Sequence, residues 1–193
     1  GDKVHVVFMT NGVGARDESC KEVQERQRCS KNAALILGTS STQQFDFPDN
    51  KMDMVALLDI VQVVERVIDK LRPKIIYTHH TGDLNVDHQM VHKAVMTACR
   101  PQPSFSVKEI YTFEVLSSTD WQTPGCEPFI INKYIDVTDY IEIKKRAMEC
   151  YGKELRPPPH TRSSENIVRL NALRGSCIGV DYAEAFCSVR HIS

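Results

Sequence analysis

The chain has 193 residues, 41% of them hydrophobic, and a formal net charge of −1, which together fit one globular domain and favour neither nucleic acid nor an anionic membrane as a partner. Its longest apolar stretch is interrupted by charged residues and no signal peptide is evident, so we expect no membrane span. Seven cysteines without a C-x-x-C pair argue against a disulfide framework and a cysteine zinc cage, and we expect a cytoplasmic protein.

Strands and helices are expected to alternate along the first part of the chain. Runs of β-branched and aromatic residues mark the strands, and Gly38 and Pro73 mark the ends of the first two helices. The elements expected in this part are strands at residues 3–10, 43–47, 74–78 and 107–116 and helices at 18–38, about 52–71 and 88–99. The second half is less regular, with strands expected at 129–138 and 184–189 and helices expected from about 140 to 155 and from 163 onward.

This alternation predicts an α/β fold in a single domain that spans residues 1–193. Strands joined by helices of this length imply right-handed crossovers, and therefore a mainly parallel sheet with helices on both faces, which is a three-layer sandwich. Residues 3–10 and 74–78 form nearly continuous apolar runs. Because such runs suit strands covered on both faces, we expect both strands to be internal.

One stretch, YTHHTGDLNVDHQMVH at residues 77–92, concentrates side chains that bind metals and carry protons. It holds four of the chain's seven histidines together with Asp83 and Asp87. Ligands of open parallel sheets bind beyond the carboxyl ends of the strands, and His79 and His80 follow directly on the strand expected at 74–78. The histidine stretch therefore lies where a site is expected.

A structural interpretation of the same residues stays open. Polar loops between a strand and a helix are common, and Asp87 could simply cap the helix that follows. For His92 we favour an ordinary solvated position on the helix face. For Asp87 and His88 we favour a function, because both follow the end of a strand.

Five segments along the chain form a larger pattern: VHVVFMTNGVGAR, NAALILG, YTHHTGDLNVDHQMVHKAV, PHTRSSENI and LRGSCIGVDYAEAF. Together and in this order they resemble the bacterial branch of the PIG-L/LmbE-like zinc-dependent N-deacetylases. The resemblance covers nearly the whole chain. It implies a Rossmann-like α/β fold and a zinc-dependent hydrolase that removes the N-acetyl group from an N-acetylglucosamine-type sugar or glycoconjugate.

The resemblance gives roles to three residues of the histidine stretch. His88 matches the family's zinc-ligand histidine, which closes an H-x-D-H-like element that here begins at Asn85. Asn85 stands where many members have a histidine that polarises the substrate carbonyl, and its amide can still donate a hydrogen bond to a developing oxyanion. Asp87 would fix the geometry around the metal ligand, as a neighbouring carboxylate or a loop anchor. We therefore take Asn85 and Asp87 as candidate catalytic residues.

Substrate-binding residues are also implied by the resemblance. Arg26 matches the family's helix arginine near the substrate pocket, although Cys29 replaces the glutamate that commonly follows three residues later. His160 and Arg162 match an H-x-R-S turn that lies near the sugar site. We expect Arg26 and His160 to converge with His88 and its neighbours on one pocket at the carboxyl end of the sheet.

The sequence leaves several features of the substrate and the assembly open. His80 could line the pocket, and so could His79, and the sequence does not rank the two. The expected partner is a small N-acetylated sugar, whose identity is not specified. Self-association is one alternative for the oligomeric state.

One family element has no counterpart in the chain. A His-Pro-Asp-Asp motif at the end of the family's first strand supplies two zinc ligands and the general base, and nothing of the kind precedes the strand expected at 3–10. A catalytic zinc needs three protein ligands, so we expect the chain as written to bind little zinc and to deacetylate poorly. The protein is then either a longer enzyme or a catalytically silent sugar-binding or structural member of the same fold.

Overall fold

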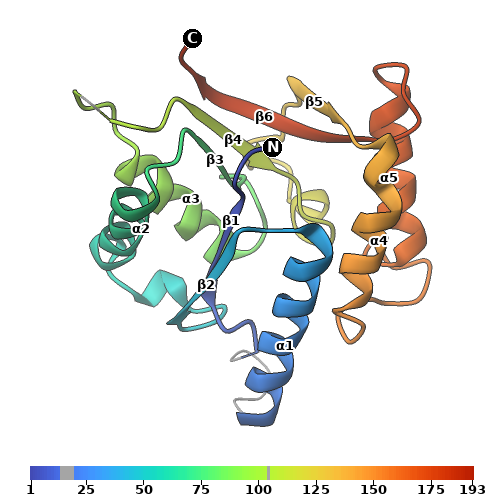
Figure 1. The fold of residues 1–193 in the computed structure, drawn as a ribbon, viewed down its shortest axis with the longest axis horizontal. Coiled ribbons are helices and arrows are strands. Elements are labelled where there is room, and N and C mark those ends of the chain that lie inside the picture. Colours follow the sequence, from blue (N-terminus) through green and yellow to red (C-terminus); the bar gives the residue numbers. More distant parts are fainter. Residues whose placement is uncertain (14–19, 104) are drawn as a thin grey trace. The chain divides into compact units, whose positions relative to one another are not determined.

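A computed structural model describes residues 1–13, 20–103 and 105–193 (Figure 1). The chain divides into two compact units, which are described separately: residues 1–50 with 136–184, and residues 51–135 with 185–193. The first two residues of the helix expected at 18–38 lie outside the described residues.

The first unit contains a parallel pair of strands joined by a long helix. β1 (His5–Thr10) and β2 (Ser41–Phe47) pair in parallel, and α1 (Cys20–Leu37) connects them. Gly38 follows α1 with a φ of 68°. This left-handed conformation suits glycine, which has no Cβ to clash, and it ends the helix where the sequence predicts.

Two shorter helices belong to the same unit. α4 (Ile141–Glu149) packs against α1, and α5 (Ser164–Ser176) packs against α4 (Figure 1). Ser163 caps α5, because its buried hydroxyl accepts a hydrogen bond from the backbone N–H of Asn166 at 3.1 Å. Among the described residues, the short 3₁₀ helices are η1 (Met52–Met54), η2 (Thr119–Trp121) and η3 (Thr138–Tyr140).

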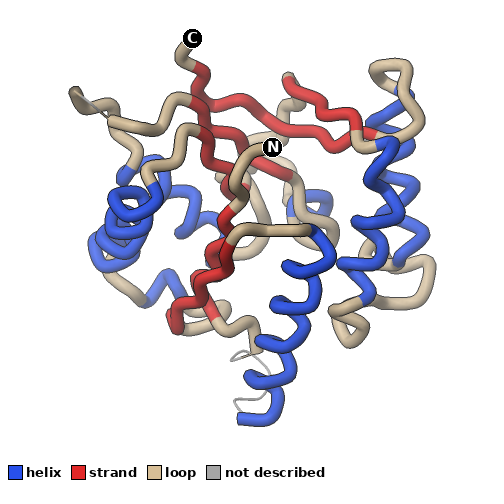
Figure 2. The backbone as a smooth tube through the Cα atoms, viewed as in Figure 1, coloured by secondary structure: helices blue, strands red, loops and turns tan. Residues whose placement is uncertain are grey.

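The described residues form a four-stranded sheet in the order β3-β4-β6-β5 (Figure 2). Most of this sheet belongs to the second unit. Its strands are β3 (Ile75–His79), β4 (Glu109–Phe113), β5 (Lys133–Asp136) and β6 (Ala183–His191). β3 and β4 are parallel, whereas β4 and β6 are antiparallel. The fold is therefore mixed α/β, with a sheet that is partly parallel.

Two helices pack together in the second unit. α2 (Leu57–Leu71) packs against α3 (Val86–Ala98), and α3 also packs on β3 (Figure 1). Ile60, Val64 and Ile68 recur every four residues of α2 and are buried, as expected for one apolar helix face. Over the part of the chain that is described, no helix combines the length and the apolar composition that crossing a membrane requires.

The expectation that both apolar runs form internal strands is wrong for the described sheets. β3 lies at the edge of its sheet, where Ile75 and Tyr77 are 38% and 44% exposed, and β1 pairs with β2 in a separate sheet. The expected mainly parallel sheet also includes the antiparallel strand β6. Local composition reports how well a strand can be buried, but its neighbours depend on segments far away in the sequence.

Candidate functional site

The histidine stretch forms the loop between β3 and α3, and this loop is fastened to the backbone of Glu127. Nε2 of His80 lies 2.8 Å from the carbonyl oxygen of Glu127, and the His80 side chain is only 4% exposed. Gly82 passes so close that an added Cβ would lie 2.0 Å from the same oxygen. Only glycine allows this approach, so the loop is held in one path. These contacts make His80 a loop anchor, and its proposed contact with substrate stays a prediction.

Asp83 is the centre of the polar contacts in this loop. Its carboxylate is fully buried and accepts hydrogen bonds from the backbone N–H of Asn85 at 2.9 Å, from Oγ1 of Thr119 at 2.8 Å and from the hydroxyl of Ser118. Burial by itself raises the pKa of Asp83, but the contacts with His88, Ser118 and Asn85 outweigh burial and lower this pKa to about 2. Asp83 is therefore a buried carboxylate that is ionised at neutral pH.

His88, in the first turn of α3, lies beside Asp83. Nδ1 of His88 lies 3.0 Å from Oδ1 of Asp83, close enough for a hydrogen bond although the two groups are not well aligned for one. A histidine that gives its Nδ1–H to a carboxylate keeps the lone pair on Nε2, the atom that can then bind a metal or accept a proton. The arrangement supports the role of His88 as a metal ligand, which stays a prediction.

His79, at the end of β3, stacks on His88. The ring centroids are 4.0 Å apart and the planes differ by 20°. The pKa of His79 is lowered to about 3. Burial is the main cause, and the charge of His88 also contributes. Nδ1 of His79 is buried without a hydrogen-bond partner. Of the two histidines that the sequence could not rank, His79 is thus the one beside His88.

His92 contacts the backbone of β3. Its Nδ1 lies 2.9 Å from the carbonyl oxygen of His79. The pKa of His92 is lowered, mainly because the ring is partly buried. The expectation of a solvated histidine on the helix face is therefore wrong in part, because the ring is half-buried. The error arises because helical periodicity does not show which face of α3 packs on β3.

Asn85 and Asp87 have structural contacts at the start of α3. Asn85 is the N-cap, and its side-chain oxygen accepts a hydrogen bond from the backbone N–H of Asp87 at 2.8 Å. Asp87 is 6% exposed, and its Oδ1 accepts a hydrogen bond from the backbone N–H of Met52 at 3.0 Å. Asp87 is thus a loop anchor rather than the cap. The catalytic roles of both residues stay predictions.

In the first unit, two candidate substrate-binding residues bind Glu154, and a third contacts the backbone of one of them. The guanidinium of Arg26 donates hydrogen bonds to Oε1 of Glu154 and, at 3.2 Å, to the carbonyl of Gly12. Arg162 donates to Oε2 of the same carboxylate at 3.1 Å. Nδ1 of His160 accepts a hydrogen bond from the backbone N–H of Arg162 at 3.0 Å. The family pattern thus selected residues that are neighbours in space.

The candidate residues therefore form two groups, one in each unit. Their expected convergence on a single pocket stays a prediction. Sequence patterns assign no role to Glu154, and they single out Asp83 only as one of the side chains in the histidine stretch. The pattern DLN before the helix could have identified Asp83, because a carboxylate two residues before an N-cap can accept the backbone N–H of the cap residue.

The residues present do not complete a zinc site. No group of three or more histidine, cysteine, aspartate or glutamate side chains within residues 1–13, 20–103 and 105–193 is arranged to hold a metal ion. Nε2 of His88 is one suitable donor, but the neighbouring Asp83 already accepts hydrogen bonds on both oxygens. A catalytic zinc requires three protein ligands. We therefore derive no chemical step through a metal.

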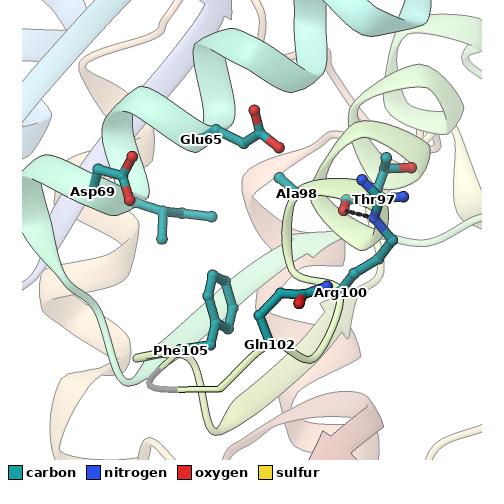
Figure 3. Close-up of a pocket in the computed structure, with 8 residues that line it drawn as sticks. Glu65, Asp69, Thr97, Ala98, Arg100, Gln102 and Phe105 are labelled. Carbon is teal, nitrogen blue, oxygen red and sulfur yellow. Dashed lines mark hydrogen bonds between the residues drawn. The ribbon is translucent and has the colours of Figure 1, made fainter.

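A cavity of about 240 Å³ lies at the other end of α3 (Figure 3). It is lined by Glu65, Ile68, Asp69, Thr97, Ala98, Arg100, Gln102 and Phe105. Nε of Arg100 donates a hydrogen bond to the carbonyl oxygen of Thr97 at 3.0 Å. None of the candidate residues lines this cavity, so it is not part of the histidine site.

Comparison with known proteins identifies the family. Residues 1–99 match the family described as PIG-L: GlcNAc-PI de-N-acetylase. The chain belongs to the PIG-L family. An Escherichia coli (strain K12) protein described as uncharacterized deacetylase YaiS is 32% identical over 108 residues, which are 53% of this chain and 56% of that protein. The match thus spans about half the length of this curated relative.

Solved structures share the fold of this PIG-L chain. The conserved protein TT1542 from Thermus thermophilus has a TM-score of 0.77 and 19% identity, with 99% of this chain and 83% of that chain covered. N,N'-diacetylchitobiose deacetylase from Pyrococcus horikoshii has a TM-score of 0.73 and 18% identity, covering 97% and 73%. GalB, the 4-carboxy-2-hydroxymuconate hydratase from Pseudomonas putida KT2440, has a TM-score of 0.75 and 23% identity, covering 99% and 85%. These similarities concern the fold alone.

Proposed function

We propose that the protein is a zinc-dependent hydrolase that removes the N-acetyl group from an N-acetylglucosamine-type sugar or glycoconjugate. The observation that carries the proposal is the PIG-L match, which includes the buried Asp83 and the partly exposed His88 beside it. Two names support the substrate class: the family description specifies GlcNAc-PI, and one solved structure of similar fold is named N,N'-diacetylchitobiose deacetylase.

The roles of individual residues follow from their contacts. His88 is proposed as a zinc ligand through Nε2, with Asp83 fixing its orientation. Asn85 and Asp87 hold the start of α3, and through it the position of His88. Arg26, His160 and Arg162 are proposed to bind the sugar. The remaining zinc ligands are not assigned to described residues.

We also propose that residues 1–193 form one PIG-L/LmbE-like domain with a Rossmann-like three-layer arrangement. The similarity to solved structures over 97 to 99% of the chain supports this. A small sugar substrate, a cytoplasmic location and the absence of nucleic acid partners complete the proposal, in agreement with the net charge of −1.

A catalytically silent sugar-binding or structural protein is the second candidate function. It is favoured by one observation, namely that the described residues do not bring three metal ligands together. The hydratase GalB has a similar fold, so this fold does not by itself prescribe deacetylation.

Acetate release from N-acetylglucosamine and N,N'-diacetylchitobiose, measured with and without added zinc, distinguishes the two candidates. The 193-residue chain would be compared with a version extended upstream by a strand that ends in His-Pro-Asp-Asp. Zinc-dependent release by the extended version supports the hydrolase, and we expect little release by the chain alone. Sugar binding without release by either version would instead support the silent protein.

A further inference from the structure

Arg26 and Arg162 share the carboxylate of Glu154, although the three residues come from distant parts of the sequence. Arg26 lies on α1, whereas Glu154 and Arg162 lie between α4 and α5. All three side chains are only partly exposed, at 24% for Arg26, 30% for Arg162 and 21% for Glu154. One carboxylate between two guanidinium groups offsets their mutual repulsion and allows both to stay close together.

The guanidinium of Arg26 is held from several directions. Besides Glu154 and the carbonyl of Gly12, the ring of Tyr151 lies under it, 5.7 Å from the guanidinium carbon to the ring centroid. Gly12 also stands close to this side chain, since a Cβ at that position would lie 3.6 Å from Nε of Arg26. The orientation of Arg26 is therefore defined by its surroundings.

Position 29 differs from the resemblance pattern in a way that concerns Arg26. The resemblance pattern places a glutamate three residues after the helix arginine, on the same face of the helix, but this chain has Cys29 there. Cys29 lies one helical turn after Arg26 on α1, and residues three apart on a helix share a face. A glutamate at position 29 could therefore reach the guanidinium of Arg26, which Glu154 binds in this structure.

We propose that Glu154 is the positioning residue of the sugar-binding group, and that it replaces the carboxylate absent from position 29. Glu154 acts through Arg26 and Arg162, which it holds in the orientation that binds the substrate. The sugar as ligand rests on the proposed function, whereas the orientation of the two arginines does not.

The test uses the 193-residue chain and two measurements. NMR signals of the arginine Nε–H groups report the orientation of Arg26 and Arg162, and titration with N-acetylglucosamine reports sugar binding. In Glu154→Gln we expect both arginine signals to shift and the sugar affinity to fall about tenfold, because a charge-assisted hydrogen bond to each arginine is lost. In the double variant that also carries Cys29→Glu, the Arg26 signal should move back to its position in the unmodified chain. Most of the affinity for N-acetylglucosamine should also be restored.

Glu25→Gln is the matched control, because Glu25 lies on α1 and pairs with Lys153, one residue before Glu154. It should change neither the arginine signals nor the affinity. Unchanged arginine signals in Glu154→Gln would overturn the positioning role. If Cys29→Glu does not restore the shifted Arg26 signal, Glu154 does not replace the carboxylate absent from position 29. If the signals respond as expected but no variant binds the sugar, the positioning role stands and the proposed substrate is wrong.

Discussion

Nδ1 of His88 lies 3.0 Å from Oδ1 of Asp83, and Asp83 is completely buried. A buried carboxylate is tolerated only when donors surround it, and here a backbone N–H and two hydroxyls do so. The hydrogen bonds from these donors stabilise the ionised form of Asp83 beside the imidazole of His88. The pair is thus a fixed arrangement supported by two segments of the second unit, the histidine loop and the start of η2.

Asp83→Asn should destabilise the protein. The amide cannot accept all the hydrogen bonds that the carboxylate accepts, so at least one buried donor among Ser118, Thr119 and the backbone N–H of Asn85 loses its partner. The free energy of unfolding, measured by urea denaturation at pH 7, should fall by about 1–3 kcal/mol. Asp53→Asn, at an exposed position, is the control and should change little. Equal stability of both variants would contradict the central role of Asp83.

His79 should make the protein less stable as the pH falls. The folded state lowers the pKa of His79 from 6.5 to about 3, so between these values the unfolded state binds more protons. Stability therefore declines as the pH falls from about 6.5 towards 3. In His79→Gln this decline should be smaller between pH 6.5 and 4.5, as measured by urea denaturation at several pH values. A decline as steep in His79→Gln as in the unmodified chain would contradict this prediction.

Gly82→Ala should disrupt the histidine loop. An added Cβ would lie 2.0 Å from the backbone oxygen of Glu127, and neither backbone segment can move without losing the His80 contact. We expect a loss of about 1–3 kcal/mol in the free energy of unfolding. Gly152→Ala is the matched substitution, because its nearest neighbour would be 3.6 Å away, an ordinary contact. A thermal unfolding midpoint as high in Gly82→Ala as in Gly152→Ala would show that the loop adjusts.

Zinc binding should depend on ligands beyond those that the described residues bring together. The 193-residue chain is expected to retain little zinc after dialysis, as measured by atomic absorption, because His88 is its single assigned ligand. An upstream strand ending in His-Pro-Asp-Asp should raise the zinc content towards one ion per chain. His88→Ala in the extended protein should lower it again, whereas His92→Ala should not. Full zinc content in the extended His88→Ala protein would exclude His88 as a ligand.

The sequence predicted the local features of this fold well. Strands, helices and the position of the histidine loop follow from periodicity, Gly38 and Pro73, because these signals act within a few residues. Long-range features were missed. The edge position of β3 depends on strand pairing, and Asp83 and Glu154 gain their importance from partners 35 and 128 residues away. No local pattern contains that information.

The side chain of His80 fastens the histidine loop to the backbone carbonyl of Glu127, while the Glu127 residue itself is exposed. The two sides of this junction therefore tolerate mutation very differently. Almost any amino acid at position 127 offers the same carbonyl oxygen, so evolution or an engineer can change the charge there freely. Position 82 has no such freedom. The surface beside the histidines can thus be redesigned at position 127 without moving the loop that carries them.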